Sequence, residues 1–287
     1  MKYLGIIALL VGFAVLSCNG GAADQPAEEK KAEAKRIVSL NGTITEVLYA
    51  LNADKQLIAV DVTSTYPAST EKLPNLGHVR GVTAESILAM KPTDVLCFED
   101  ELNPQIKQQL EAAKINVVAL KREFSVASTK QVIGEIAGWL GEKEQGAVLV
   151  AQIDKDLKKK KNLSNKPKVL FVYARGAGTL MVAGDNTQMT EMIRLAGGRN
   201  AVSGFPDFKP LTAEAVVAAN PDVILMFDSG KSSLSGAGGV LGIPGVKSTT
   251  AGKNNAVITM DGQLLSGFGP RVGTAIATLN NELGSLN

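Results

Sequence analysis

Residues 82–98 read VTAESILAMKPTDVLCF, and residues 211–227 read LTAEAVVAANPDVILMF. Each copy starts at a threonine that can cap a helix, continues through a helical stretch to a proline, and ends in an apolar, strand-like run. The copies align when one residue is skipped. A helix that leads into a buried strand is part of an α/β unit. A long-period duplication without further copies predicts two similar lobes and not a solenoid.

Two shorter pairs of similar segments occur in the same order in both halves of the chain. Residues 45–50 (TEVLYA) resemble 190–195 (TEMIRL), and 115–120 (INVVAL) resemble 256–260 (AVITM). Strands are expected at 36–40, 56–61, 94–98 and 115–120, and helices through 46–51 (capped by Thr43 or Thr45), at 83–90 and at 104–114. Because strands alternate with helices, the fold class is predicted as α/β, with parallel sheets flanked by helices in both lobes.

Between the two lobes, apolar residues recur at three- and four-residue steps, which predicts one or two helices broken near Gly141 or Gly146. Two α/β lobes joined by a long helical connector leave a ligand cleft between them. The predicted boundaries are a signal peptide at 1–17, a flexible tether at 18–35, an N-terminal lobe at 36–124, a connecting helix at 125–162 and a C-terminal lobe at 163–287.

The first residues have the features of a targeting signal. Lys2 precedes a short apolar run, Leu4–Leu16, which ends before Ser17 and Cys18. This pattern resembles a bacterial lipoprotein signal, in which the cysteine is lipidated; an ordinary signal peptide with a chance cysteine is the alternative. If Cys18 carries lipid, Cys97 has no partner for an intramolecular disulfide, and its apolar neighbours predict a buried small hydrophobe.

Composition is that of an ordinary globular protein: 287 residues, 45% hydrophobic, 20% charged, with a net charge of +2. This balance does not indicate nucleic-acid binding. The sequence has no Gly-x-Ser-x-Gly elbow, no Walker A run and no His-Glu-x-x-His motif. His78 is the one histidine, too few for the usual nitrogen-rich metal site. We therefore expect no enzymatic activity and no catalytic cofactor.

Residues 61–77 (DVTSTYPASTEKLPNLG) follow a predicted strand, where ligands bind in open α/β sheets. Tyr66 precedes Pro67, which restricts it to extended geometry. A phenol on a stiff loop can hydrogen-bond, stack or ligate a hard metal ion as phenolate. A tyrosine that only packs over the loop is the alternative.

Together, the signal, the anchor, the two matching lobes and the bridging helix resemble the substrate-binding lipoproteins of ABC importers. The closest class has a long helical connector and carries haem, cobalamin, siderophores or metal ions. The resemblance covers residues 36–287. Three patterns resemble the haem-binding members: DVTSTYP at 61–67, LPNLG at 73–77 and GFGPR at 267–271. Cobalamin-binding members share a similar Tyr-Pro loop.

This resemblance implies that Tyr66 is the axial ligand of ferric haem, a hard ligand for a hard ion. Arg271 is then either the cation that favours the phenolate or a clamp for a haem propionate. Arg80 matches a basic position that contacts propionate, and Arg175 is a weaker candidate. A surface salt bridge is the alternative for each arginine.

Phe268 can stack on the porphyrin or pack in the core. His78 stands where the family often has tyrosine, and it is either a second haem contact or a structural histidine. Glu85 and Glu214 hold equivalent places in the two repeats. An acid in the first turn of a helix suits the macrodipole, and the resemblance implies that both glutamates also dock onto the permease.

The resulting hypothesis is a monomeric, lipid-anchored haem-binding protein that delivers haem to an ABC permease dimer. It would act in the periplasm or on the outer face of the cytoplasmic membrane, without changing its ligand. The alternatives are a cobalamin- or ferric-siderophore-binding protein of the same importer class, and a lipoprotein hydrolase, against which the missing nucleophile–base pair counts.

Overall fold

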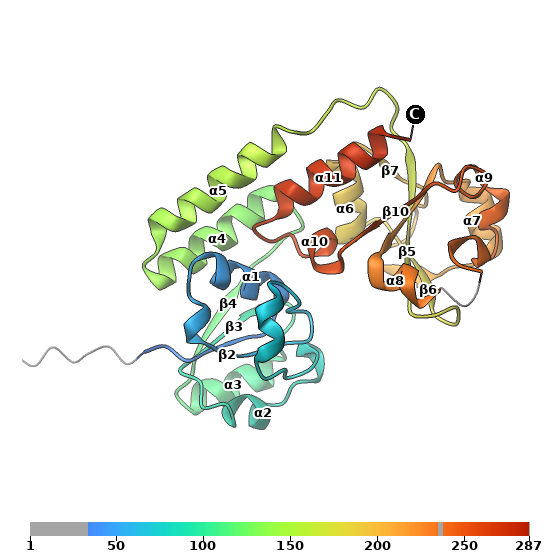
Figure 1. Cartoon of the computed structure of the whole chain (residues 1–287). Helices are drawn as coiled ribbons and strands as arrows, with labels where there is room; N and C mark the ends of the chain where they lie inside the picture. Colours follow the sequence, from blue (N-terminus) through green and yellow to red (C-terminus); the bar gives the residue numbers. More distant parts are fainter. Residues whose placement is uncertain (1–33, 235–237, 287) are drawn as a thin grey trace, which may run out of the picture. The chain divides into compact units, whose positions relative to one another are not determined.

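A computed structural model describes residues 34–234 and 238–286. The predicted signal peptide, Cys18 and most of the predicted tether therefore lie outside the described residues. The chain from Ala34 onward forms one compact unit, built on two sheets with helices packed around them (Figure 1).

The first sheet is parallel throughout and has the strand order β2-β1-β3-β4. With its helices it makes up the N-terminal lobe. Its strands are β1 (Ile37–Ser39), β2 (Leu57–Val60), β3 (Asp94–Phe98) and β4 (Asn116–Leu120), and its helices are α1 (Gly42–Ala50), α2 (Ala84–Leu88) and α3 (Pro104–Ala112). All residues of β1 and β3 are buried, as expected for central strands of a parallel sheet.

The second sheet has the order β10-β9-β5-β6-β8, with β7 paired to β5, and with its helices it makes up the C-terminal lobe. Its strands are β5 (Lys168–Ala174), β6 (Leu180–Ala183), β7 (Arg199–Asn200), β8 (Phe208–Pro210), β9 (Val223–Phe227) and β10 (Val257–Met260). Its helices are α6 (Gln188–Leu195), α7 (Ala213–Ala219), α8 (Asp228–Ser233), α9 (Thr250–Lys253), α10 (Gly262–Ser266) and α11 (Val272–Gly284).

The prediction that both sheets are parallel is wrong for the C-terminal lobe. Strands β6 and β8 run antiparallel, because the chain reverses directly after β5 and the N–H of Arg175 donates to the carbonyl of Thr179. The α/β fold class itself is confirmed.

The predicted duplication is confirmed. Strands β1, β3 and β4 lie side by side in parallel, and β5, β9 and β10 repeat this arrangement in the second sheet. Thr83 caps α2 and Thr212 caps α7 through equivalent side-chain hydrogen bonds. The predicted cap of α1 is wrong: Asn41 accepts the cap hydrogen bond, and Thr43 and Thr45 lie inside the helix.

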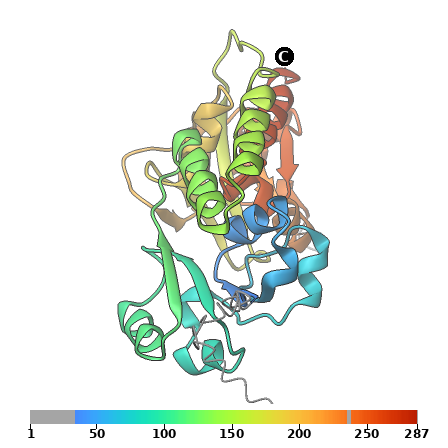
Figure 2. The same cartoon turned by 90° about the vertical axis from the view of Figure 1, so that its left-hand side faces the viewer.

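The segment between the two sheets holds two helices, α4 (Val126–Leu140) and α5 (Lys143–Leu157). They separate at Gly141, whose φ of 83° suits a residue without a side chain. Helix α5 packs on α4 and on α11, and Figures 1 and 2 show α4 and α5 side by side. Of the one or two helices predicted for this segment, the structure has two, with the break at the predicted Gly141.

Short 3₁₀ helices occupy Asp54–Gln56, Ala68–Lys72, Val79–Gly81, Val240–Gly242 and Val246–Ser248. Within residues 34–234 and 238–286, no helix is long and apolar enough to cross a membrane.

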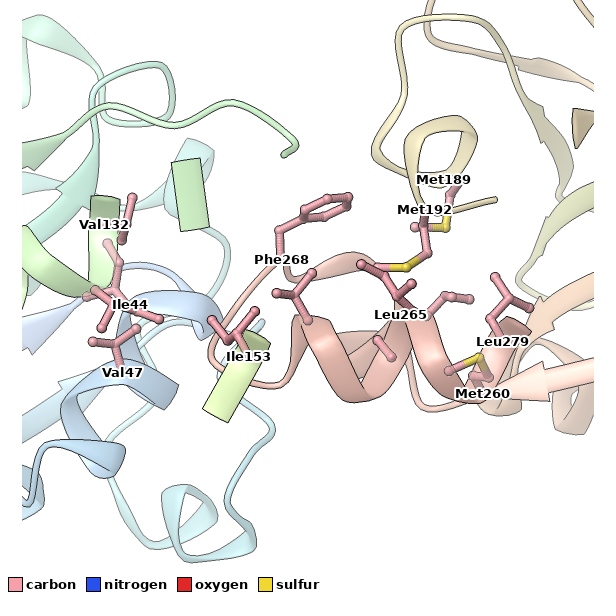
Figure 3. Packing of buried hydrophobic residues seen from close by; sticks show 14 of the residues in the cluster. Ile44, Val47, Val132, Ile153, Met189, Met192, Met260, Leu265, Phe268 and Leu279 are labelled. Carbon is pink, nitrogen blue, oxygen red and sulfur yellow. The ribbon is translucent and has the colours of Figure 1, made fainter. Parts of the chain in front are cut away.

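One cluster of buried apolar side chains runs through both lobes and the helical pair. Figure 3 shows part of it, with contributions from α1, α4, α5, α6, α10 and α11. Because this cluster is continuous, contacts in the C-terminal lobe help to hold the elements that carry the N-terminal loop 61–77.

Candidate functional site

A buried hydroxyl network anchors the base of loop 61–77. The carboxylate of Asp61, which is 1% exposed, accepts hydrogen bonds from the hydroxyls of Thr63 (2.7 and 3.0 Å) and Ser64 (2.8 Å). The Ser64 hydroxyl lies 2.8 Å from that of Thr45, which donates to Ser39 at 2.8 Å. The loop is thus fixed to β1 and α1 before it reaches the tyrosine.

Asp61 should make stability depend on pH. Burial raises the pKa of this carboxyl, although hydrogen bonds from Thr63 and Ser64 oppose the shift. A carboxyl whose pKa is raised by folding contributes stability below its unfolded pKa, near about 3.9, and loses it as the pH rises through the folded value. The difference in unfolding free energy, wild type minus Asp61→Asn, should therefore fall as the pH rises above about 4. Urea unfolding at several pH values measures this difference, and a constant difference would contradict the prediction.

At the tip of the loop, Tyr66 is 43% exposed and joins Pro67 through a cis peptide bond. The Thr70 hydroxyl donates to the carbonyls of Ser64 and Pro67 at 2.9 Å each, which closes the turn that follows the tyrosine. The loop therefore presents an accessible phenol on a hydrogen-bonded support.

Arg271, at the start of α11, packs against this phenol. Its guanidinium carbon lies 3.5 Å from the centroid of the Tyr66 ring, within the range of a cation–π contact. The same guanidinium binds Glu46 of α1 with two hydrogen bonds, from Nε to Oε1 at 2.8 Å and from Nη2 to Oε2 at 2.9 Å. Burial alone would lower the pKa of Arg271, but the hydrogen bonds and charge of Glu46, together with Tyr66 and Asp261, raise that pKa overall.

Gln263 of α10 joins the two lobes beside this pair. Its Nε2 donates to the carbonyl of Gly42 at 2.8 Å and to Oε2 of Glu46 at 3.2 Å. Its Oε1 accepts from the backbone N–H of Thr65 at 2.8 Å and from the Thr65 hydroxyl at 2.9 Å. We call these residues, with Arg271, the interlobe seam.

Two hollows adjoin the interlobe seam and share no lining residue. A cleft of about 580 Å³ lies between the lobes, lined by polar groups that include Asn41, Glu101, Arg122, Gln188, Asp228 and Asp261. A side pocket of about 500 Å³ is lined by Tyr66, Arg271, Tyr49, Leu149, Gln152 and Thr274, among others. The predicted tyrosine–arginine pair thus lines the side pocket, whereas Thr65 lines the interlobe cleft.

The structure does not bring the other predicted basic residues to this pair. Arg80 and His78 are exposed in and beside the 3₁₀ helix Val79–Gly81, where the N–H of Arg80 donates to Nδ1 of His78 at 3.2 Å. Arg175 is exposed in the turn between β5 and β6. None of the three lines the interlobe cleft or the side pocket.

The structure places Phe268 in the apolar core, whereas the sequence left both core packing and porphyrin stacking open. Its side chain is 4% exposed and belongs to the apolar cluster that spans both lobes (Figure 3). It packs on Phe124 with ring centroids 5.6 Å apart, and its carbonyl accepts from the Thr129 hydroxyl at 2.8 Å. Phe268 therefore packs in the core, as the alternative interpretation held.

Glu85 and Glu214 lie at the same position of α2 and α7, one residue into each helix, and both are exposed. Hydrogen bonds from its own backbone N–H and from Thr83 lower the pKa of Glu85. The prediction that Cys97 is buried is confirmed, and burial raises the pKa of its thiol to about 12.

Sequence reasoning missed Glu46, Gln263 and Arg122. Glu46 is 6% exposed and lies in a helix whose residues 42–48 are all buried, and a charge within such a stretch is the signal that could have identified it. Arg122 donates to Glu101 at 2.7 Å from a position in the interlobe cleft. Nothing in the sequence around Gln263 distinguishes it from a surface glutamine.

Comparison with protein families matches residues 37–264 to the family described as periplasmic binding protein. The chain belongs to the periplasmic binding protein family. A Bacillus subtilis relative, the uncharacterized ABC transporter substrate-binding lipoprotein YvrC, is 30% identical over 252 residues, covering 84% of this chain and 77% of its own. The vitamin B12-binding protein of Yersinia pestis is 27% identical over 197 residues, covering 67% of this chain and 69% of its own.

Solved structures of periplasmic binding proteins share the fold. The periplasmic heme-binding protein RhuT from Roseiflexus sp. RS-1, in its apo form, superposes with a TM-score of 0.83 at 38% identity, covering 88% of this chain and 99% of its own. The periplasmic heme-binding protein BhuT in complex with two hemes gives 0.82 at 33% identity, with the same coverage. Both are binding proteins, and neither name describes an enzyme.

Among the described residues there is no group of three or more His, Cys, Asp or Glu that could hold a metal ion.

Proposed function

We propose that this periplasmic binding protein captures haem outside the cytoplasm and delivers it to an ABC importer, with Tyr66 as the axial ligand of the ferric iron. One observation carries the assignment. An accessible phenol, 43% exposed on a hydrogen-bonded loop, has the guanidinium carbon of Arg271 3.5 Å from its ring centroid, and a phenolate oxygen is a hard ligand that suits ferric iron. The heme-binding structural neighbours support the same cargo.

Arg271 was open to two roles, and its contacts favour the action on Tyr66. Both its Nε and Nη2 groups are engaged by Glu46, and its face is engaged by the tyrosine ring. A propionate would have to share the guanidinium with a buried carboxylate that already binds one of its edges. We therefore assign propionate contacts to the exposed Arg80, with Arg175 as a weaker candidate, and a haem contact to His78 only if Tyr66 is excluded.

A hemin titration of the full chain, purified in mild detergent, tests the proposal. We expect saturable binding, a shifted Soret band and the phenolate-to-iron charge-transfer bands of tyrosinate haem. Saturable binding without those bands would retain the cargo and reject Tyr66 as ligand. An unchanged hemin spectrum throughout the titration would reject haem as the cargo.

A second cargo is favoured by the interlobe cleft. Amide and carboxylate groups line it, and its one cationic side chain, Arg122, is already paired with Glu101. Amide-rich ligands such as cobalamin suit that lining, and vitamin B12-binding relatives match this chain. Titration with hydroxocobalamin under the same conditions distinguishes the two: a cobalamin affinity greater than the hemin affinity would favour this second function.

We further propose that Glu85 and Glu214 dock onto the two subunits of the permease, since they occupy equivalent exposed positions in the two repeats. The double variant Glu85→Ala/Glu214→Ala should bind hemin normally yet lose most haem uptake when supplied with the permease, roughly tenfold or more if each desolvated charge pair contributes over about 1 kcal/mol. Uptake of labelled haem into membrane vesicles measures this loss.

Control substitutions at Glu111 and Glu282, which are also exposed on helices, should leave uptake unchanged. Normal uptake by the Glu85→Ala/Glu214→Ala protein would remove the docking assignment while leaving haem capture intact.

The remaining elements of the proposal concern location and organisation. We propose lipid anchoring at Cys18 behind a signal peptide at 1–17 and a tether at 18–35, a monomeric state, and lobes at 36–124 and 163–287 joined through 125–162. The name of the Bacillus subtilis relative, a substrate-binding lipoprotein, supports the anchor. Metabolic labelling with a radioactive fatty acid, compared between the wild type and Cys18→Ala, tests it.

A further inference from the structure

A closed ring of contacts surrounds Tyr66. Arg271 covers the tyrosine ring, Glu46 grips Arg271 with two hydrogen bonds, and Gln263 donates to the same carboxylate at 3.2 Å. Gln263 then accepts two hydrogen bonds from Thr65, the residue bonded to Tyr66 in the chain. The ring therefore reaches the tyrosine twice, once through its side chain and once through its backbone.

Stability is a weak explanation for this arrangement. The Glu46 side chain is 6% exposed and that of Arg271 is 25% exposed. Desolvating both charges offsets much of their attraction, and apolar replacements of buried ion pairs are often at least as stable. The surrounding residues of α1 are buried, so an apolar side chain at position 46 would suit the packing. The carboxylate instead fixes the direction of the guanidinium that faces Tyr66.

We propose that Glu46 and Gln263 are positioning residues. They keep the Arg271 guanidinium stacked on the Tyr66 ring and thereby set the strength of the bond between Tyr66 and the iron. This inference rests on the proposed haem-binding function. Neither residue touches the iron: Glu46 acts through Arg271, and Gln263 acts through Glu46 and Thr65.

The charge of Glu46 has an electronic consequence. Arg271 withdraws electron density from a phenolate that it faces, and the Glu46 carboxylate bound to its Nε and Nη2 groups offsets part of that positive field. With Glu46 in place, the phenolate keeps more of its donor strength toward ferric iron. When the carboxylate is neutralised, the donor orbital of the phenolate falls in energy, and the phenolate-to-iron transition requires more energy.

The test compares charge with geometry at position 46. Glu46→Gln removes the charge, and we expect its charge-transfer band to move to higher energy and its hemin affinity to fall by about 10- to 100-fold, the usual range for lost outer-shell partners of a metal ligand. Glu46→Asp keeps the charge but shortens the side chain, so its affinity should fall while its band stays closer to that of the wild type. Gln263→Leu should weaken hemin binding without removing the Glu46 charge.

The matched control is Glu191→Gln, because Glu191 also forms a bidentate pair with an arginine, Arg194, but within the exposed surface of α6. It should leave both the band and the affinity unchanged. Urea midpoints of all variants show whether each protein is folded. If folded Glu46→Gln matches the wild type in band position and affinity, the inference is overturned.

A readout in the ligand-free protein separates this inference from the proposed function. In the wild type, the Arg271 Nε proton should exchange slowly with water in NMR spectra, because Glu46 accepts its hydrogen bond, and the exchange should accelerate in Glu46→Gln. A wild type that lacks tyrosinate bands but shows this protection would reject the cargo and retain the positioning of Arg271. Fast exchange in the wild type would reject the ring of contacts whatever the cargo.

Discussion

Replacing Tyr66 with phenylalanine should abolish the tyrosinate charge-transfer bands of the hemin complex and weaken hemin binding by roughly 100-fold or more, beyond the range for outer-shell partners alone. The substitution removes the phenol oxygen but retains a ring on which Arg271 can lie. The loop is anchored elsewhere, through Asp61 and Ser64, so it should keep its conformation. Absorption spectra and hemin titration of the purified full chain measure both effects.

Tyr49→Phe is the matched control, because Tyr49 is a second phenol that lines the same side pocket. It should bind hemin as the wild type does. Tyr66→Ala removes the ring as well, and its additional loss relative to Tyr66→Phe measures what the stack with Arg271 contributes. If the tyrosinate bands persist in Tyr66→Phe, another tyrosine is the iron ligand. Loss of the bands in Tyr49→Phe would then identify Tyr49 as that ligand.

Elements with strong local signals could be predicted from the sequence. The strands β3 and β9, the helices that precede them and their threonine caps follow from patterns within about seventeen residues. Apolar runs and caps are short-range features, which is why the duplication predicts the parallel core of both sheets correctly. The antiparallel pair β6 and β8 has no counterpart in the first copy, and a repeat cannot predict what was added to one lobe only.

Some residues of the candidate site could likewise be predicted from local sequence, and others could not. Tyr66 and Arg271 stand out locally, one before a proline and the other after Gly-Phe-Gly-Pro, and the structure brings them together although 205 positions separate them. Glu46 and Gln263 are recognisable only from contacts across the interlobe seam. Phe268 is buried in this structure, and burial of a loop residue depends on packing that its neighbours in the sequence do not encode.

Replacing Phe268 with alanine should lower the free energy of unfolding by about 3–5 kcal/mol, the usual cost of removing a buried phenylalanine ring. The ring is 4% exposed and packs on Phe124 within the cluster that spans both lobes. The Thr129 hydroxyl also holds the carbonyl of this residue. Urea unfolding followed by circular dichroism measures the loss. Phe205→Ala is the control, because that ring is only partly buried and should cost less.

Hemin affinity alone would not decide the role of Phe268, because Arg271 lies three residues further along the same loop and a cavity at position 268 can displace it. Phe268→Leu separates the two roles. Leucine fills most of the cavity but cannot stack as an aromatic ring, so a core residue predicts a smaller loss of stability and nearly normal hemin binding. A porphyrin-stacking residue predicts weaker hemin binding at nearly normal stability. That second pattern would return Phe268 to the ligand site and require the interlobe cluster to open when haem binds.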